Sequence, residues 1–411
     1  SFTKIGAATL TLSGANTYRG ALTISAGTLT LADNATNILP DTSNVVLANT
    51  AGAILNINGK SAETIGTLSG GGATGGNITL GDGNLTLNTR TNATYGGVIS
   101  GSGSLTKNGI AAQTLEGQST YTGGTTINAG QLKSGVDNAI LTTGAVTLTS
   151  SGDLIVKDGI SQTITNLTSS STNSRITLRG TGALTVTQSS NGTFAGVIRG
   201  RGPFTKSGNA ILTLSNDNTY TGNTTVSAGT LKVTGTLNDR NNVIVNGGTY
   251  DVDANDTVKS ISGSGGTIDI ADSVTLTENS RLNKTYAGVV AGSGTLSKAG
   301  AGALTLSGTN TVANVSISGG QVKVSGTLSD SAVVTVGTGS SYLVQANDTI
   351  GSIAGAGTIN IANDVTLSAG NDSNATTFSG VIGGRGSFTK IGAATLTLSG
   401  ANTYRGALTI S

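Results

Sequence analysis

Acidic side chains are the first place to look for chemistry, because the 411-residue chain contains no His and no Cys. The densest acidic group is Asp251, Asp253 and Asp256, and carboxylate oxygens at this spacing are ligands that calcium accepts. A sister stretch at 342–367 keeps only one of the three, Asp348. We therefore expect a solvated corner here, keep a calcium site as the weaker alternative, and predict no cofactor.

A lysine recurs five times in the same local sequence, at Lys4, Lys107, Lys206, Lys298 and Lys390. The successive spacings are 103, 99, 92 and 92 residues. A lysine repeated in this way could bind an anionic glycan, which is one hypothesis for its function. A lysine at one corner of every repeat, however, more often keeps that edge soluble or caps backbone carbonyls. We favour the structural interpretation.

An enzyme requires more reactive side chains than this chain offers. Glycoside hydrolysis needs a pair of carboxylates flanking the scissile bond, and the chain has 20 Asp and Glu in total. No phosphate-binding loop, metal-ligand cluster or activated nucleophile is visible in the sequence. We predict that the chain is not an enzyme, with a carbohydrate-active β-helix enzyme as a remote alternative.

The lysines belong to a repeated sequence that also occurs at both ends of the chain. The 25 residues "SFTKIGAATLTLSGANTYRGALTIS" at 1–25 return unchanged at 387–411, and diverged copies occupy 104–128, 203–227 and 295–318. This divides the chain into units 1–103, 104–202, 203–294 and 295–386, after which 387–411 starts the next copy of the first unit. We expect a piece of a longer array with a period of 386 residues, whose number of copies the sequence does not give.

Aromatic residues follow the same repeat. Tyr18, Tyr121, Tyr220 and Tyr404 occupy one position at the unit heads, and Tyr95, Phe194, Tyr286 and Phe378 occupy one position near the unit ends. Aromatic residues that bind a ligand would gather on one loop instead of recurring in every unit. We predict that these eight residues are structural.

The elements that must position these residues are short strands. Apolar residues alternate with Thr, Ser or Asn for three to five positions, as in Leu10 and Leu12 or Leu22 and Ile24, and Gly, Asn or Asp then interrupts the pattern. Period two indicates strands with one buried face, and no helical period separates them. Coils that stack each strand on its counterpart one turn earlier satisfy the backbone hydrogen bonds of such a chain. The predicted fold is all-β, a parallel β-helix that continues along the chain, with roughly 20–25 residues per coil.

The unit heads, read together as "LTKxGxxxLTLSGxNTYTGGTTIxxGxL", resemble the passenger-associated transport repeat of bacterial autotransporters. The resemblance covers about a third of the chain and implies a right-handed parallel β-helix on the outer surface of a Gram-negative bacterium. It also implies secretion through a C-terminal β-barrel outside this stretch. The fourth unit departs from the pattern, since Val312 replaces the Tyr and the following Gly is lost.

Composition and charge narrow the partners. The net charge is +2 and only 10% of residues are charged, which excludes nucleic acid as the main ligand, and no apolar run is long enough for a membrane-spanning helix. We predict that the chain is part of the shaft of a tandemly repeated cell-surface fibre. Its expected partners are neighbouring copies of the repeat, and other fibres or cell-surface glycans are further candidates. The alternative is a lateral adhesin that binds glycans or matrix through unit-specific loops such as 70–77 and 169–174.

Overall fold

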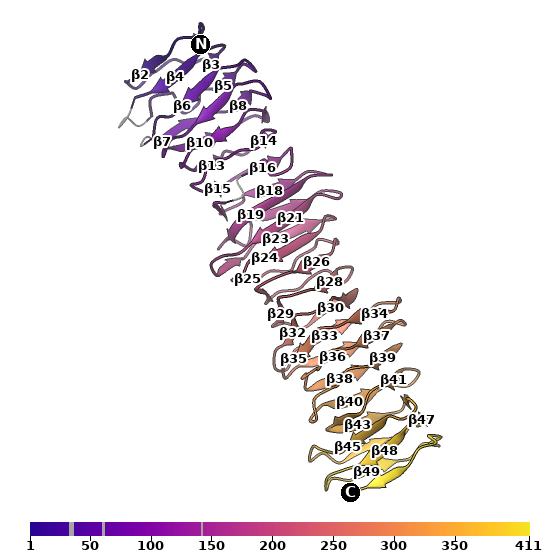
Figure 1. The fold of residues 1–411 in the computed structure, drawn as a ribbon. Coiled ribbons are helices and arrows are strands. Elements are labelled where there is room, and N and C mark those ends of the chain that lie inside the picture. The colour runs from indigo at the N-terminus through magenta and orange to yellow at the C-terminus, as the bar shows by residue number, and fades with distance from the viewer. Residues whose placement is uncertain (33–36, 60–61, 141–142) are drawn as a thin grey trace. The chain divides into compact units, whose positions relative to one another are not determined.

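The computed structural model describes residues 1–32, 37–59, 62–140 and 143–411 as two compact units, Ser1–Thr221 and Gly222–Ser411. Within each unit, short strands follow one another as stacked rungs (Figure 1). All the registered strand pairs are parallel, and partner residues lie 17 to 26 positions apart in the sequence, for example Ser341 with Thr358 and Thr28 with Ile54. Each coil of the chain therefore returns directly beneath the preceding one.

The first unit contains three long ladders and one short pair. One ladder is β1 (Phe2–Lys4), β3 (Leu22–Ile24), β5 (Val45–Leu47), β8 (Leu68–Gly70), β11 (Ala93–Tyr95), β14 (Ala112–Leu115), β16 (Gln131–Ser134), β18 (Asp153–Val156), β20 (Arg175–Leu178) and β23 (Val197–Gly200). Another is β7 (Ala62–Ile65), β10 (Asn84–Asn88), β13 (Leu105–Asn108), β15 (Thr125–Ile127), β17 (Ala145–Leu148), β19 (Ser161–Thr168), β21 (Ala183–Thr187) and β24 (Phe204–Ser207). The rest are β2 (Leu10–Leu12), β4 (Thr28–Leu31), β6 (Ile54–Asn56), β9 (Asn77–Thr79) and β12 (Ile99–Ser100), and the pair β22 (Gly192–Phe194) and β25 (Ile211–Leu214).

The second unit is built in the same way. Its longest ladder is β30 (Asp256–Val258), β33 (Thr275–Glu278), β36 (Thr295–Lys298), β38 (Asn314–Ile317), β40 (Val333–Val336), β43 (Ser352–Gly355), β46 (Thr376–Phe378) and β49 (Leu396–Leu398). A second contains β34 (Lys284–Tyr286), β37 (Ala303–Leu306), β39 (Gln321–Val324), β41 (Ser341–Val344), β44 (Thr358–Ile361) and β47 (Val381–Gly384). The shorter ladders are β26 (Thr224–Val226), β28 (Asn242–Val245) and β31 (Ser260–Ser262); β27 (Thr230–Val233), β29 (Thr249–Val252), β32 (Thr267–Ile270) and β35 (Val289–Ala291); and β42 (Asp348–Ile350), β45 (Thr366–Ala369), β48 (Ser387–Lys390) and β50 (Leu408–Ile410).

The alternation read from the sequence decides which side chains are inside. In β37, for example, Leu304 and Leu306 are fully buried while the intervening Thr305 stays on the outer side. Leu, Ile and Val at such positions stack from coil to coil and form the core of each unit. The predicted parallel β-helix is confirmed, and no helix occurs among the described residues.

The repeat boundaries stay a prediction. The division between the two compact units, at Thr221 and Gly222, falls inside the third sequence unit. Glycines that recur in the turns explain part of the repeat, because some have a backbone that other residues rarely adopt. Gly109, for example, has a φ of 75°, and an added Cβ would lie 2.2 Å from the carbonyl oxygen of Thr89.

Candidate functional site

The five repeat lysines are the chain's most regular candidates for chemistry, and the structure turns them inward. Lys107, Lys206 and Lys298 are fully buried, Lys4 is 6% exposed and Lys390 is half-buried. The residue two positions earlier is apolar in each case, and it is buried before Lys107, Lys206, Lys298 and Lys390, as Leu105 is before Lys107. An inward lysine cannot bind a ligand at the outer surface.

Each lysine ammonium caps the carbonyls of a tight turn. Lys107 Nζ donates to the carbonyl oxygens of Asn108 at 2.6 Å, Gly109 at 2.9 Å and Ala129, on the next coil, at 3.1 Å. Lys4 makes the same three bonds one repeat earlier. Burial lowers the pKa of Lys107 and of Lys206 to about 8. Of the two structural alternatives, this geometry is the carbonyl cap.

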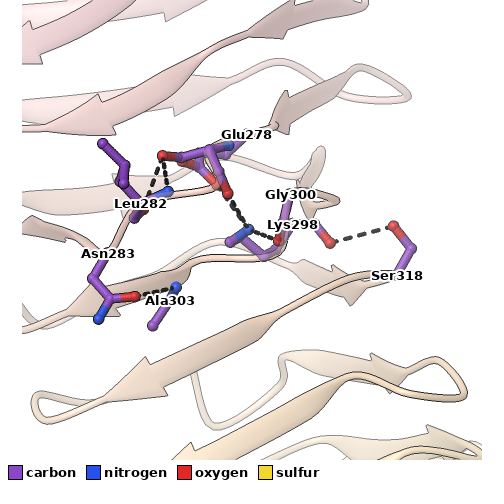
Figure 2. Close-up of polar contacts among 8 residues, drawn as sticks. Glu278, Leu282, Asn283, Lys298, Gly300, Ala303 and Ser318 are labelled. Carbon is purple, nitrogen blue, oxygen red and sulfur yellow. Dashed lines mark hydrogen bonds and ion pairs between the residues drawn. The ribbon is translucent and has the colours of Figure 1, made fainter.

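The fourth lysine has a buried carboxylate as well. Figure 2 shows Lys298 between Glu278 on the preceding coil and the carbonyl of Gly300. The Nζ lies 3.2 Å from Glu278 Oε2, and both side chains are fully buried. Burial raises the pKa of Glu278, and the neighbouring ammonium opposes that shift. The register places Leu87, Val186 and Ala369 in the corresponding slot above Lys107, Lys206 and Lys390, so these three lysines lack the carboxylate that Lys298 has.

A second repeated polar column is formed by the Asn that precedes Thr and the repeated Tyr, or Thr and Val312 in the fourth unit. Asn310 Oδ1 accepts a hydrogen bond from the Val290 amide at 3.0 Å, and its Nδ2 donates to the carbonyls of Gly308 and Thr327. Asn218 and Asn402 accept from the amides of Ile198 and Ile382 in the same way. Sequence analysis does not single out this column, although the recurrence of Asn before Thr was the available signal.

The repeated aromatic residues also lie inside. Tyr95, Tyr121, Tyr220, Phe194, Tyr286 and Phe378 are fully buried, while Tyr18 and Tyr404, in the first and last coils of the stretch, are half-buried. Two of the buried tyrosine hydroxyls donate to backbone carbonyls: Tyr95 to that of Gly76 at 2.7 Å and Tyr286 to that of Gly266 at 3.0 Å. The head aromatics also contact one another, since the rings of Phe204 and Tyr220 lie 6.0 Å apart. None of these contacts presents an aromatic platform to a ligand.

The acidic group is divided between two environments. Lys232 Nζ lies 3.0 Å from Asp251 and 2.5 Å from Asp253, so these two carboxylates already share a cation of the chain. Asp256 is buried and bonds the amide of Leu237 at 3.1 Å. Among residues 1–32, 37–59, 62–140 and 143–411, no three His, Cys, Asp or Glu side chains are grouped as a metal site would require. The calcium site stays a prediction that this arrangement does not favour.

The two unit-specific loops are compact turns. In loop 70–77, the Thr74 amide and hydroxyl both bond Asn49 on the preceding coil, and Gly72 pairs with Gly75. In loop 169–174, the hydroxyls of Ser169 and Ser174 lie 2.5 Å apart. These loops present small polar side chains to solvent. In the described part of the chain, no helix is long and apolar enough to cross a membrane.

Comparison with known proteins agrees with this geometry. The family model described as the passenger-associated-transport-repeat matches residues 2–31, 105–133, 204–233, 296–324 and 388–411, which are the segments that contain the capping lysines. The adhesin BmaC autotransporter of Brucella suis biovar 1 (strain 1330) is 34% identical over 456 aligned positions, which include the whole of this chain. The chain spans 12% of the length of that relative. No solved structure matches the chain.

Proposed function

The chain is an autotransporter passenger β-helix with passenger-associated-transport repeats, and on this premise we propose that it is a segment of the shaft of a large cell-surface adhesin. In this proposal the segment supplies length and rigidity, and the adhesive contact is made elsewhere in the protein. Its partners are the neighbouring copies of the 386-residue repeat, and its location is the exterior of the bacterial cell.

One observation supports the shaft above all others: the lysines and aromatic residues that recur in the repeats point into the fold. The repeat lysines bond backbone carbonyls inside the coils, and the repeat aromatics are largely buried. A repeat selected for ligand binding would keep its recurring charged and aromatic residues on the outer surface. A repeat that keeps these residues inside preserves the stacking of coils.

The identical ends of the chain offer a clean test. Deleting residues 1–386 in frame leaves 387–411 at the junction, and these residues match 1–25 letter for letter, so the coil entering the next segment is unchanged. A matched control removes residues 1–376 and joins different repeat positions. The shaft proposal predicts that cells with the first deletion still adhere and carry a shorter fibre, whereas the control is poorly exported.

Replacing the unit-specific loops distinguishes the shaft proposal from the lateral-adhesin alternative. Loops 70–77 and 169–174 are replaced by Gly- and Ser-containing sequences of equal length that retain Gly72, Gly75, Ser169 and Ser174. Adhesion of the producing cells and surface display are then measured together. Unchanged adhesion at unchanged display supports the shaft, and lost adhesion at unchanged display would move the contact to the side of the β-helix.

A further inference from the structure

Four polar side chains occupy one repeat-equivalent position inside the stack of coils. Each faces inward and is stacked against an apolar residue of the following coil: Glu63 against Leu85, Gln162 against Leu184, Asp256 against Leu276 and Asp348 against Leu367. Glu63 and Gln162 are 1% exposed, and Asp256 and Asp348 are 6% exposed. We call these four residues the latch residues. They take no part in the hydrogen bonds by which the repeat lysines cap backbone carbonyls.

Each latch residue holds the turn of the preceding coil through a backbone amide. The amides of Ile38 and Leu39 donate to Glu63 at 3.0 and 2.9 Å. The Leu237 amide donates to Asp256 at 3.1 Å, and the Leu328 amide donates to Asp348 at 3.1 Å. In the second repeat the Ile140 amide donates to Gln162 at 3.2 Å. The same contact is therefore made by three carboxyls and one amide.

The groups around each carboxyl make its charge costly. An aspartate lies two residues after the held amide, at Asp41, Asp239 and Asp330, and it raises the pKa of the latch carboxyl after the larger effect of burial. The other titratable neighbours are tyrosines: Tyr18 near Glu63, Tyr250, whose hydroxyl bonds Asp256 at 3.3 Å, and Tyr342 near Asp348. Backbone amides oppose the shift, and the resulting pKa is about 7 for Glu63 and Asp256 and about 6 for Asp348.

Gln162 shows that an uncharged side chain can hold the turn from this position. Its Oε1 accepts from the Ile140 amide, and its Nε2 donates to the carbonyls of Ile140 at 2.8 Å and Thr163 at 2.7 Å. A neutral carboxyl is uncharged like this amide, whereas a carboxylate places a negative charge in the same buried position. In the same repeat the sequence places Thr142, which lies outside the described residues, where the other repeats have Asp41, Asp239 or Asp330. Both carboxyls are thus absent together from one repeat.

We propose that Glu63, Asp256 and Asp348 are pH-responsive latches that hold the preceding turn when neutral and loosen it when ionised, and that Gln162 is a latch without pH response. Two of the carboxyls have a path for the proton. Asp256 and Asp348 each line an open groove whose other residues are mainly Thr, Asn, Ser and Asp, including Thr257 beside Asp256 and Thr349 beside Asp348.

The direction of the response follows from linkage. A carboxyl whose pKa is raised by folding keeps its proton in the closed turn while the opened turn is ionised, so acidification from pH 7 towards pH 4 stabilises the turn. With an ordinary pKa near 4, opening of the turn increases roughly 100-fold between pH 5 and pH 8 for a latch at about 7. The increase is about 10-fold for a latch at about 6.

Amide hydrogen exchange measures this turn by turn in one molecule. The protection factors of the Leu39, Leu237 and Leu328 amides are measured at pH 5 and pH 8, corrected for the intrinsic pH dependence of exchange, with a chelator in both buffers. The Ile140 amide, held by Gln162, is the internal control. The proposal predicts a fall in protection at the three carboxyl turns and no fall at Ile140. Equal changes at all four amides, or no change at the three, would overturn it.

Two variants keep the test independent of the internal control. Asp256→Asn should remove the pH response at Leu237 and leave that at Leu328 intact. Gln162→Glu should create a response at Ile140 in a repeat that lacks one. A pH response at Leu237 that persists in Asp256→Asn would assign it to another group and refute the latch.

Discussion

Ser119 replaces the repeated Asn in the second unit and should be the easiest place to stabilise this chain. Its hydroxyl is buried and has no hydrogen-bond partner among the described residues. The backbone around it matches the repeats that retain Asn: the Thr120 amide bonds the Ile99 carbonyl at 2.8 Å, as the Thr311 amide bonds Val290 at 2.8 Å. An Asn at position 119 should therefore find the Ile99 amide where Asn310 finds that of Val290.

The magnitude follows from the three hydrogen bonds that Asn310 makes to backbone groups. Each contributes about 1 kcal/mol net, and ordering the longer side chain costs about 1 kcal/mol. Ser119→Asn should raise the free energy of unfolding by about 2 kcal/mol. The reverse change, Asn310→Ser, should lower it by about the same amount or more, because it leaves the Val290 amide without its acceptor.

Urea unfolding followed by far-UV circular dichroism compares the wild type with Ser119→Asn, Ser119→Ala and Asn310→Ser. The Ala variant removes the unpartnered hydroxyl without adding bonds, so it measures that contribution alone. The reasoning is refuted if Ser119→Asn is no more stable than Ser119→Ala.

Three further predictions test the interior of the coils. Burial lowers the pKa of Lys107 to about 8 in the folded chain, so the free energy of unfolding should rise by roughly 2 kcal/mol between pH 8 and pH 9.5. Urea unfolding at a series of pH values measures this rise. The contribution of Lys107 to it should be absent in Lys107→Met. Glu278→Ala should lower the free energy of unfolding by about 3 kcal/mol, because it leaves Lys298 buried without its carboxylate. The double change Glu278→Leu with Lys298→Met should restore thermal stability. Equal losses of stability in the single and the double variant would contradict the role of the buried pair. Thr305→Pro, in the middle of a strand paired on both sides, should cost about 3 kcal/mol or more and slow export, whereas Ser329→Pro, at the position where the first repeat carries Pro40, should be exported normally in a surface-display assay.

Much of the fold could be predicted from the sequence because one rule, alternation in register, decides both burial and stacking. The same rule predicts that the repeat lysines face inward, since Lys107 lies two positions after the inward-facing Leu105. The charge of the lysines alone suggested a place at an outer corner. The alternation of buried and outward positions instead places their side chains inside the coils. The latch residues follow the rule too: Glu63 and Ile65 share a face.

Other contacts could not be predicted because they depend on which residues lie one coil apart. Glu278 meets Lys298 across 20 residues, whereas Tyr250 meets Ile268 across 18 and Gly70 meets Tyr95 across 25. Turn lengths set these offsets, and turn residues carry no periodic signal. The partner of a buried charge therefore emerges only when the coils are in register.

The shaft proposal is tested most directly by the length added with each copy of the repeat. With about 20 residues per coil and coils about 4.8 Å apart, a period of 386 residues adds roughly 90 Å. Electron microscopy of purified chains with one, two and three tandem copies measures this increment. Equal increments of roughly 90 Å per copy are the predicted result. Particles whose length does not grow with copy number would contradict the shaft.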